Sequence, residues 1–553
     1  MPILSFLIFL PVLASILVAV LPDSYKSQFR WIALIVTGLQ LAGCIWVFTN
    51  FDRQSSDIQF LEQQDWITLS LGSLGTVSID YLIGLDGVSM PMALLTGLVM
   101  FIGSISSFEI KQKEKAYFSL YLLLSGSVMG CFLALDFFLF YLFFEFMLLP
   151  MYFLIGLWGG PRREYASLKF FIYTLFGSIF ILIVMIGLYF SVIDPYETAI
   201  HAGFIDVKSQ MTPEIFGQIQ ELIKELKIAP EHMVHTFDMR LMTDSGNFLP
   251  QSLLSYVSGS TLFSVPARYL AFIFLMIGFA IKLPAVPVHT WLPDAHVEAP
   301  TPVSVVLAGI LLKIGGYGFI RIAYSIFPDG AENFAVWIAA FGVLSIIYGA
   351  YNALAMNDLK KMIAYSSVSH MGFVMLGIAS LTSEGINAAL YQMFSHGILS
   401  SMLFLLVGVL YDRVHDRRID SYRGLAVKMP VFTAFVAIAF FASLGLPAFS
   451  GFIGEFFSLM GAFNSSFLPK IFAVLGAFGI VLGAGYFLWA LQKMFFGKFW
   501  VREHEELLTD LNFREKIMLT PLAILAFVFG ILPHLLFDIT SPTISEFMKL
   551  WIK

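Results

Sequence analysis

The sequence predicts an all-α polytopic membrane protein with about 14 transmembrane helices. Hydrophobic residues make up 58% of the 553 residues, charged residues make up only 13%, and the mean hydropathy is +0.83. This composition is typical of membrane proteins. Apolar runs of about 20 residues, the length that crosses a bilayer, recur along the chain. The runs are centred near residues 12, 40, 95, 126, 147, 180, 275, 312, 345, 370, 398, 445, 482 and 527.

The first apolar run, within residues 1–22, has the hydrophobic character of a signal peptide. It lacks a basic segment at its start, its apolar part is too long, and no small-residue cleavage pattern follows. We therefore interpret it as the first membrane helix.

Composition and motifs exclude several classes of function. The two cysteines, Cys44 and Cys131, both lie in apolar runs, which excludes a disulfide framework, a cysteine-rich zinc site and an all-cysteine iron–sulfur cluster. The net charge of −6 is thinly spread and indicates no nucleic-acid partner. No Walker motif and no glycine-rich dinucleotide motif is present. We expect no cofactor and no metal in this chain. Any transport by this chain must therefore be driven by a partner subunit or by an ion gradient.

The positions of Lys and Arg predict how the chain is oriented. Placing the loop of Lys26 in the cytoplasm puts most basic residues on that side, in agreement with the positive-inside rule. The basic loops begin near Lys26, Lys111, Arg162, Lys360, Arg413 and Lys493. With 14 spans, both termini lie on the outer side of the membrane.

Two segments are expected outside the membrane. Residues 51–80 are short and acidic, and residues 194–266 hold nine acidic side chains against four basic ones. Within the second segment, Thr212 and Pro213 predict the start of a helix. Its apolar face is expected to pack on the outer surface of this chain or of a neighbour. The face comprises Ile215, Ile219, Leu222, Ile223 and Leu226.

Two predicted spans contain residues that interrupt a helix. Pro284 and Pro287 follow Lys282, and proline removes a backbone donor and clashes with the preceding turn. The Gly-Leu-Pro segment 445–447 precedes Glu455. Interrupted spans at corresponding positions of two halves indicate an inverted-repeat transporter. In both spans the interruption lies beside a charged residue.

This spacing predicts four segments and two inverted repeats of five helices each. The segments are 1–110, with helices 1 to 3; 111–325, the first repeat (helices 4 to 8) with the outer insertion 194–266; 333–497, the second repeat (helices 9 to 13); and 512–553, with helix 14 and the C-terminal tail.

Four charged residues fall inside the predicted spans, namely Glu145, Lys282, Lys313 and Glu455. A charge at bilayer depth costs about 2.5–3.5 kcal/mol, and such residues usually mark an ion or proton path. Burial disfavours the charged forms of Glu and Lys, whereas a nearby opposite charge restores them. Glu145 and Lys282 therefore form a candidate proton switch, and a static ion pair is the alternative. Lys313 is a candidate relay or the cap of a backbone break. Glu455 is a candidate for proton exchange with the outer side or with a neighbouring subunit.

Three histidines and one aspartate are further candidates. His370 and His396 lie in mid-span, and their ordinary pKa near 6.5 suits proton relay. A structural role, or ligation of a haem by the two, is the alternative. His296 lies near a helix end, where hydrogen bonds to local backbone are the simplest role. Asp136 begins the fifth span, where it caps the helix or admits protons.

The segments that carry these residues resemble the antiporter-like subunits of respiratory complex I. The resemblance covers residues from about 80 to 500 and rests on FYLFFEFMLLP (140–150), on the long run from FAIKLP to GFIRI (279–322) and on NDLKKMIAYSSVSHMGF (357–373). Within that family the chain is most similar to subunit M of bacterial NADH:quinone oxidoreductase. The features typical of that branch are LPDAHVEAP, LLKIGGYG and the glutamate at 455.

The resemblance implies a 14-helix proton-pumping subunit of the membrane arm, flanked by the L and N subunits, in the bacterial inner membrane with both termini periplasmic. By this resemblance, the functional residues of the family correspond to Glu145, Lys282, Lys313 and Glu455. His370 and His396 correspond to histidines on the central polar axis of the family. FMN, iron–sulfur clusters and quinone are expected in partner subunits, so the chain is part of an enzyme without a redox centre of its own.

Three other functions remain open from the sequence. The first is an Mrp-type sodium/proton antiporter subunit, which shares the lysine–glutamate machinery. The second is a membrane subunit of a ferredoxin- or hydrogenase-linked relative. The third is a membrane scaffold without an ion path. Glu455 and the LPDAHVEAP segment favour the complex I subunit over the antiporter.

Overall fold

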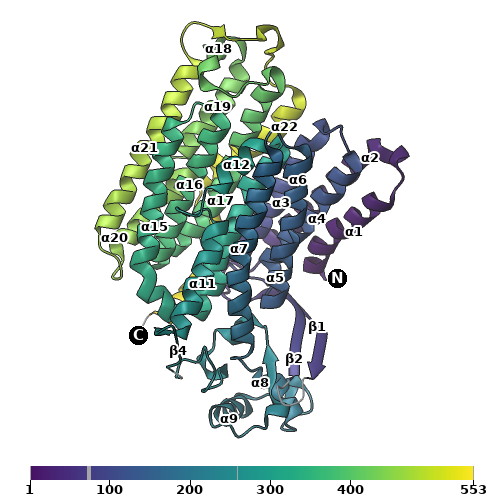
Figure 1. Cartoon of the computed structure of the whole chain (residues 1–553), viewed down its shortest axis with the longest axis vertical. Coiled ribbons are helices and arrows are strands. Elements are labelled where there is room, and N and C mark those ends of the chain that lie inside the picture. Colours follow the sequence, from purple (N-terminus) through teal and green to yellow (C-terminus); the bar gives the residue numbers. More distant parts are fainter. Residues whose placement is uncertain (1, 71–75, 258, 552–553) are drawn as a thin grey trace.

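The chain forms an elongated bundle of long helices with a smaller domain at one end (Figure 1). The computed structural model describes residues 2–70, 76–257 and 259–551. Residues 1, 71–75, 258 and 552–553 belong to the predicted terminal and outer segments and lie outside the described residues. Among the described residues, 11 helices are long and apolar enough to cross a membrane, and a twelfth span results if one pair bent by 65° counts as one. This confirms a polytopic helical membrane protein.

The smaller domain, which contains the insertion 194–266, is called the outer domain. The first half of the bundle comprises the helices that precede this insertion in the sequence. Apolar runs of about 20 residues give each of them, with α5 and α6 taken as one span, a length near or above that of the hydrocarbon core. They are α1 (Ile3–Val20), α2 (Lys26–Asn50), α3 (Ser89–Ser106), α4 (Glu114–Leu133), the consecutive α5 (Phe137–Phe146) and α6 (Leu148–Trp158), and α7 (Arg163–Tyr189).

The second half begins after the outer domain and ends with the bent pair. Short elements connect some of its helices. The helices are α11 (Ala267–Lys282), α12 (Trp291–Glu298), α13 (Thr301–Val306), α14 (Leu312–Gly318), α15 (Pro328–Ala355), α16 (Leu359–Ala379), α17 (Ser383–Val414), α18 (Leu425–Lys428), α19 (Pro430–Ser443), α20 (Ser450–Asn464), α21 (Ile471–Phe495), α22 (Phe513–Ile531) and α23 (His534–Phe547). Tyr422–Arg423 (β6) and Trp500–Val501 (β7) form a small antiparallel ladder.

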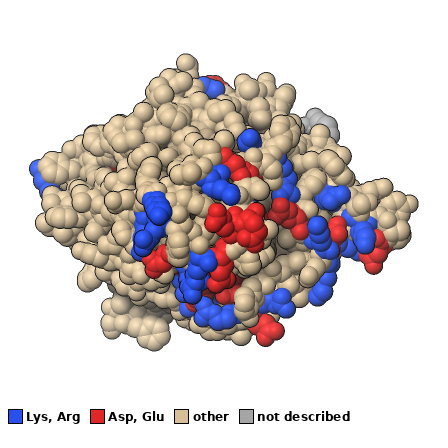
Figure 2. Space-filling model, turned by 90° about the horizontal axis from the view of Figure 1, so that it is seen from above, with Lys and Arg blue, Asp and Glu red and all other residues tan. Residues whose placement is uncertain are grey.

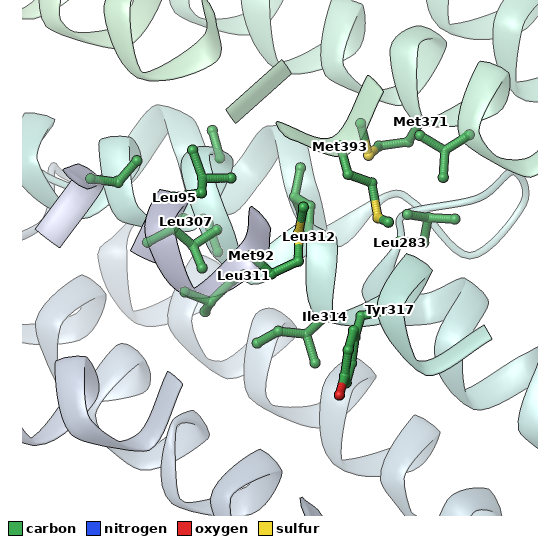
Figure 3. Packing of buried hydrophobic residues seen from close by; sticks show 14 of the residues in the cluster. Met92, Leu95, Leu283, Leu307, Leu311, Leu312, Ile314, Tyr317, Met371 and Met393 are labelled. Carbon is green, nitrogen blue, oxygen red and sulfur yellow. The ribbon is translucent and has the colours of Figure 1, made fainter. Parts of the chain in front are cut away.

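The apolar windows of the segment Thr301–Tyr324 and of α17 are completely buried, so both lie in the core of the bundle. Two π-helical turns, Leu307–Leu311 and Phe319–Tyr324, flank α14 within the segment Thr301–Tyr324. Figure 3 shows side chains of this segment packed with neighbours from several other elements. The labelled side chains are Met92, Leu95, Leu283, Leu307, Leu311, Leu312, Ile314, Tyr317, Met371 and Met393. In contrast, α1 and α21 bury only about a third of their windows.

Gly315 lets α14 approach the end of α11 directly. A Cβ atom at Gly315 would lie 2.6 Å from the backbone nitrogen of Leu283 and 2.7 Å from the carbonyl oxygen of Phe279. Both neighbours are backbone atoms and cannot rotate away. Gly315 is therefore needed for the close approach of α14 to the end of α11.

We expect Gly315→Ala to destabilise the folded protein by about 1–3 kcal/mol, because the added methyl group overpacks a backbone contact. The thermal unfolding midpoint of the detergent-solubilised protein measures this. Gly485→Ala is the matched control, since Gly485 lies in α21 with no heavy atom within 4 Å of an added Cβ. Equal midpoints for the two variants would contradict the packing argument.

The outer domain corrects the expectation of an all-α chain. Gln59–Ser70 (β1) and Thr76–Leu85 (β2) pair antiparallel, and Val234–Thr236 (β3) adds a parallel strand to β2. A second, two-residue ladder joins Thr261–Leu262 (β4) to Val265–Pro266 (β5). The strand pairing of β2 with β3 joins segments far apart in the chain, so the local composition of residues 51–80 gave no sign of it.

The insertion folds around a small apolar core of its own. It contains α8 (Pro195–His201), α9 (Pro213–Lys224) and α10 (Met239–Met242). The Thr212 hydroxyl oxygen accepts a hydrogen bond from the Ile215 backbone at 3.3 Å, so the predicted cap and helix are confirmed. The predicted face is wrong at Leu226, which follows the helix and is exposed. The core consists of Ile193, Ala199, Ile205, Ile219, Ile223, Ile228 and Met233.

The two ends of the bundle differ in what they carry. Both termini lie toward the end that carries the outer domain (Figure 1). Figure 2 shows the opposite end, where basic and acidic side chains gather among other residues. There, the ion pair Arg413–Glu515, at 2.8 Å, joins the last turn of α17 to the first turn of α22.

Candidate functional site

The interruption after α11 places Lys282 inside the bundle. The helix ends at Lys282, and regular helix resumes only at Trp291. The Trp291 indole nitrogen donates a hydrogen bond to the carbonyl oxygen of Ile281 at 2.9 Å, which satisfies a backbone group that the interruption leaves free. Lys282 thus lies at the end of α11, inside the bundle, where the regular helix stops.

Lys282 is buried to 1% exposure and its ammonium group has no hydrogen-bond partner within the described chain. It lies 4.7 Å from the ring centroid of Phe144, the residue next to Glu145. One carboxylate oxygen of Glu145 is also buried without a partner, and the ion pairs of the described residues do not include Glu145 and Lys282. The static ion pair considered from the sequence is therefore not formed in this conformation.

Lys313 is completely buried and lies beside a π-helical turn. Such turns are common at functional sites because they leave backbone groups free. The Lys313 ammonium group donates to the carbonyl oxygen of Ala308 in that turn. It also lies 2.8 Å from Nδ1 of His396 on α17. Lys313 therefore caps a backbone irregularity, which is one of its two predicted roles. It also contacts the titratable side chain of His396.

A second interruption, between α19 and α20, positions Glu455. Gly445 has φ +79°, and a Cβ atom there would lie 2.8 Å from the Glu455 carboxylate, so the backbone must approach closely. Oε1 of Glu455 lies 2.8 Å from Nδ1 of His370 on α16. The His370 and His396 rings are 5.6 Å apart between centroids.

A small cavity connects these groups. It is lined by His370, His396, Glu455 and the polar side chains Gln392 and Ser443, among others. Its volume of about 10 Å³ suits roughly one water molecule. A haem shared by the two histidines does not fit this space.

His296 is fully buried on α12, with both ring nitrogens lacking a partner among the described residues. The expected hydrogen bonds to local backbone are not formed. The ring stacks on Phe404 at 4.4 Å between centroids. His296 is within electrostatic range of both Lys360 and Lys313.

Lys360 is a buried residue that sequence reasoning missed. The alternation of the spans predicts a basic loop that begins near Lys360, yet this residue is 6% exposed and its ammonium group donates to the carbonyl oxygen of Ala299 at 2.6 Å. It lines a cavity of about 340 Å³ at the basic end of the bundle, together with Glu298, Asp412 and Arg417. Only the fold could reveal this, because burial depends on the neighbouring α12–α13 segment.

Arg321 and Asp86 form a buried ion pair that sequence reasoning also missed. Their side chains are 2.5 Å apart, and Asp86 accepts hydrogen bonds from the backbone nitrogens of Val88 and Ser89. Removing one partner of such a pair leaves an uncompensated buried charge, which costs about 3–5 kcal/mol. We assign this pair a structural role.

Asp136 caps α5 at the border of the outer domain. Its carboxylate accepts a hydrogen bond from the Leu139 backbone at 2.8 Å, so the predicted capping role is confirmed. Asp136 also forms a backbone bridge to Asp238 of the insertion. Burial raises the pKa of the Asp136 carboxyl group to about 8.

The raised pKa of Asp136 predicts a pH-dependent stability. The folded chain holds this proton more tightly than the unfolded chain, whose aspartate pKa is about 3.9, so the contribution is complete at low pH and is lost as pH rises through 8. We expect wild-type stability to fall by roughly 2 kcal/mol between pH 6 and pH 8 from this group. Asp136→Asn keeps an oxygen for the cap and should remove that slope. Thermal unfolding at the two pH values measures it, and an unchanged slope in Asp136→Asn would contradict the assignment.

Within residues 2–70, 76–257 and 259–551, no group of three or more His, Cys, Asp or Glu side chains is arranged to hold a metal ion. Cys44 and Cys131 are free and buried.

Buried acids, lysines and histidines along the interior of a membrane bundle define an ion-translocating class of membrane protein. The chain belongs to the NADH:quinone oxidoreductase/Mrp antiporter transmembrane family, whose sequence model matches residues 134–195 and 239–483, more than half of the chain. The gap in this match falls within the insertion of the outer domain.

Full-length relatives indicate which branch of this family the chain belongs to, namely NADH-quinone oxidoreductase subunit M. The subunit M of Rickettsia prowazekii is 37% identical, with 99% of each chain covered. That of Rhodobacter capsulatus is 36% identical, with 99% of this chain and 96% of the relative covered.

Solved structures share the fold over the whole chain. A chain of respiratory complex I from Thermus thermophilus with bound NADH is 28% identical, with a TM-score of 0.76 and full coverage of both chains. A chain of the Mrp complex from a Dietzia species has a TM-score of 0.75 at 20% identity, with 99% of this chain and 97% of that chain covered.

Proposed function

We propose that the chain is the proton-translocating subunit M of an NADH:quinone oxidoreductase. The observation that carries this proposal is a line of buried titratable side chains through the bundle. It runs from Lys360 and His296 through Lys313, His396 and His370 to Glu455. Quinone reduction elsewhere in the complex supplies the energy.

The interrupted helices belong to the same proposal. If α11 with α12 and α19 with α20 each form one interrupted span, the 12 spans rise to 14. The segments 111–325 and 333–497 then form two inverted five-helix repeats, each with one interruption beside a titratable residue. Helices with interrupted backbone at the bilayer midplane are a common way to build an ion site.

Glu145 and Lys282 act as the switch in this scheme. When the two side chains approach, both stay charged; when they separate, Lys282 can release its proton. Their partnerless buried atoms, in the conformation described here, support the separated form. Released protons move along the line of side chains, with water bridging the buried atoms that lack protein partners.

Protons enter at the basic end through the cavity beside Lys360, which contains the carboxylates of Glu298 and Asp412. Glu455 lies at the other end of the line and exchanges protons with the outer side or with a neighbouring subunit. Asp136 serves as a second point of exchange at the outer surface.

The relatives support the cellular setting that belongs to this proposal. The chain works in the bacterial inner membrane, with its basic end in the cytoplasm and both termini periplasmic. It assembles with other subunits of the membrane arm, including the L and N subunits. FMN, the iron–sulfur clusters and the quinone belong to partner subunits, and this chain contributes no redox centre.

An Mrp-type antiporter subunit is the alternative function. The shared fold with the Mrp complex supports it, although 20% identity indicates the fold alone. The near-complete match to subunit M chains at 36–37% identity favours the oxidoreductase.

NADH-driven proton pumping by membrane vesicles that contain the assembled complex tests the proposal. Glu145→Gln should reduce pumping roughly 10²-fold, as expected when a positioned proton-transfer group is lost. Glu145→Asp should retain more activity, because the charge remains. Full pumping in Glu145→Gln would refute the role of the switch. Wild-type vesicles without NADH-driven pumping would indicate a different energy source.

A further inference from the structure

A cavity of about 850 Å³ lies at the basic end of the bundle, away from the line of buried side chains. Its walls come from the end of α1, the start of α2, the segment between α3 and α4, and α6. Ala19, Phe29, Phe153 and Leu157 form its apolar part. Lys26, Lys111, Lys113 and Lys115 form its basic part, with Asp23 and Glu114 also present.

The four lysines carry unneutralised charge. Within the described residues, none of their ammonium groups has a carboxylate oxygen within 4.0 Å or a hydrogen-bond acceptor. The two acids leave a net charge of about +2 in the cavity. Figure 2 shows basic side chains at the right of this face, on the side where α1 and α2 lie in Figure 1.

The start of α4 adds further donors to the same cavity. Lys113 precedes this 20-residue helix and has a left-handed backbone, and no side chain caps the first turn. Its free backbone N–H groups therefore favour an anion. Lys115 and Ala116 of the first turn line the cavity.

Apolar surface continues from the cavity along the bundle. On α6, Leu149, Phe153 and Leu157 are 51%, 37% and 39% exposed and follow one another at intervals of four residues. They form a stripe of about 12 Å on one helix face. On α1, Leu13, Leu17 and Val20 are also exposed. A ligand that fits here has an anionic head at the helix ends and an apolar tail beside α1 and α6.

We propose that this cavity binds an anionic phospholipid, with the phosphate among Lys26, Lys111 and Lys113 and an acyl chain along α6. Basic pockets at the ends of membrane helices recognise such headgroups. The apolar stripe distinguishes a lipid from a free anion, and the concave, lysine-lined wall distinguishes an anionic lipid from a neutral one. The site is separate from the proton path.

Photo-cross-linking tests this proposal with the assembled complex in nanodiscs of phosphatidylcholine and phosphatidylglycerol. One probe is phosphatidylglycerol with a photoactivatable acyl chain, and the comparison probe is phosphatidylcholine with the same chain. Peptide mapping measures labelling of residues 111–120 and 149–157. We expect preferential labelling by phosphatidylglycerol. The triple variant Lys26→Gln, Lys111→Gln, Lys113→Gln should reduce it by more than roughly tenfold, since each surface lysine contributes about fivefold.

The matched control is the triple variant Arg423→Gln, Lys428→Gln, Lys498→Gln, which removes the same charge from exposed residues of other elements. It should leave the labelling unchanged. Equal labelling by the two probes would overturn headgroup recognition, and full competition by millimolar inorganic phosphate would indicate a free-anion site instead. No labelling of the wild-type cavity by either probe would also refute the proposal.

Discussion

Lys282→Ala should abolish NADH-driven proton pumping while the complex still assembles. Lys282 has no hydrogen-bond or ion-pair partner in the described structure, so its removal leaves no other buried group unsatisfied. The stability cost is therefore confined to the lost packing of its aliphatic chain against Phe144 and Phe170. The functional cost is that of a missing proton carrier, roughly 10²-fold or more. Pumping by vesicles, quinone reduction and a native gel together measure the result.

The matched control for this variant is Lys498→Ala, which removes an exposed lysine at the basic end. It should pump like the wild type. If Lys282→Ala pumps normally, the switch does not include Lys282. If it fails to assemble, Lys282→Met, which keeps most of the side-chain volume, separates packing from proton transfer. Assembly without pumping in Lys282→Met would still support the switch.

Lys313→Ala and Lys313→Arg should differ in stability but not in pumping. The alanine variant leaves the Ala308 carbonyl oxygen and Nδ1 of His396 without their shared partner, at about 1–3 kcal/mol for each buried group. The arginine variant keeps donors for both. Guanidinium does not release its proton, so relay stops in both variants. Thermal unfolding and vesicle pumping measure the two effects separately.

Pumping by Lys313→Arg clearly above that of Lys313→Ala would contradict the relay, and full pumping by Lys313→Arg would assign Lys313 a purely structural cation role. His396→Leu offers an independent check, because it removes the histidine that contacts Lys313. It should impair pumping more than His415→Leu, since His415 lies outside the line, after the end of α17.

The sequence by itself determined the membrane class, most of the apolar spans and the charged residues within them, although 11 or 12 helices among the described residues qualify as spans where the sequence predicts 14. The reason is that these features depend on local composition: a run near 20 apolar residues has few alternatives in a bilayer, and a charge inside such a run is costly wherever its neighbours lie. The two interruptions, after Lys282 and before Glu455, were also local, because Pro and Gly act on the backbone that carries them. The helix at 213–224 was predicted from its cap and apolar period.

Only the tertiary structure decided which of these residues meet. Lys313 contacts His396 across 83 positions of the chain, and His370 contacts Glu455 across 85. No local pattern encodes such distances, since they arise from how whole helices pack. The burial of Lys360 and the strand β3 beside β2 have the same origin. Both depend on segments far away in the sequence, and a side chain is buried, or a strand paired, only when those segments fold against it.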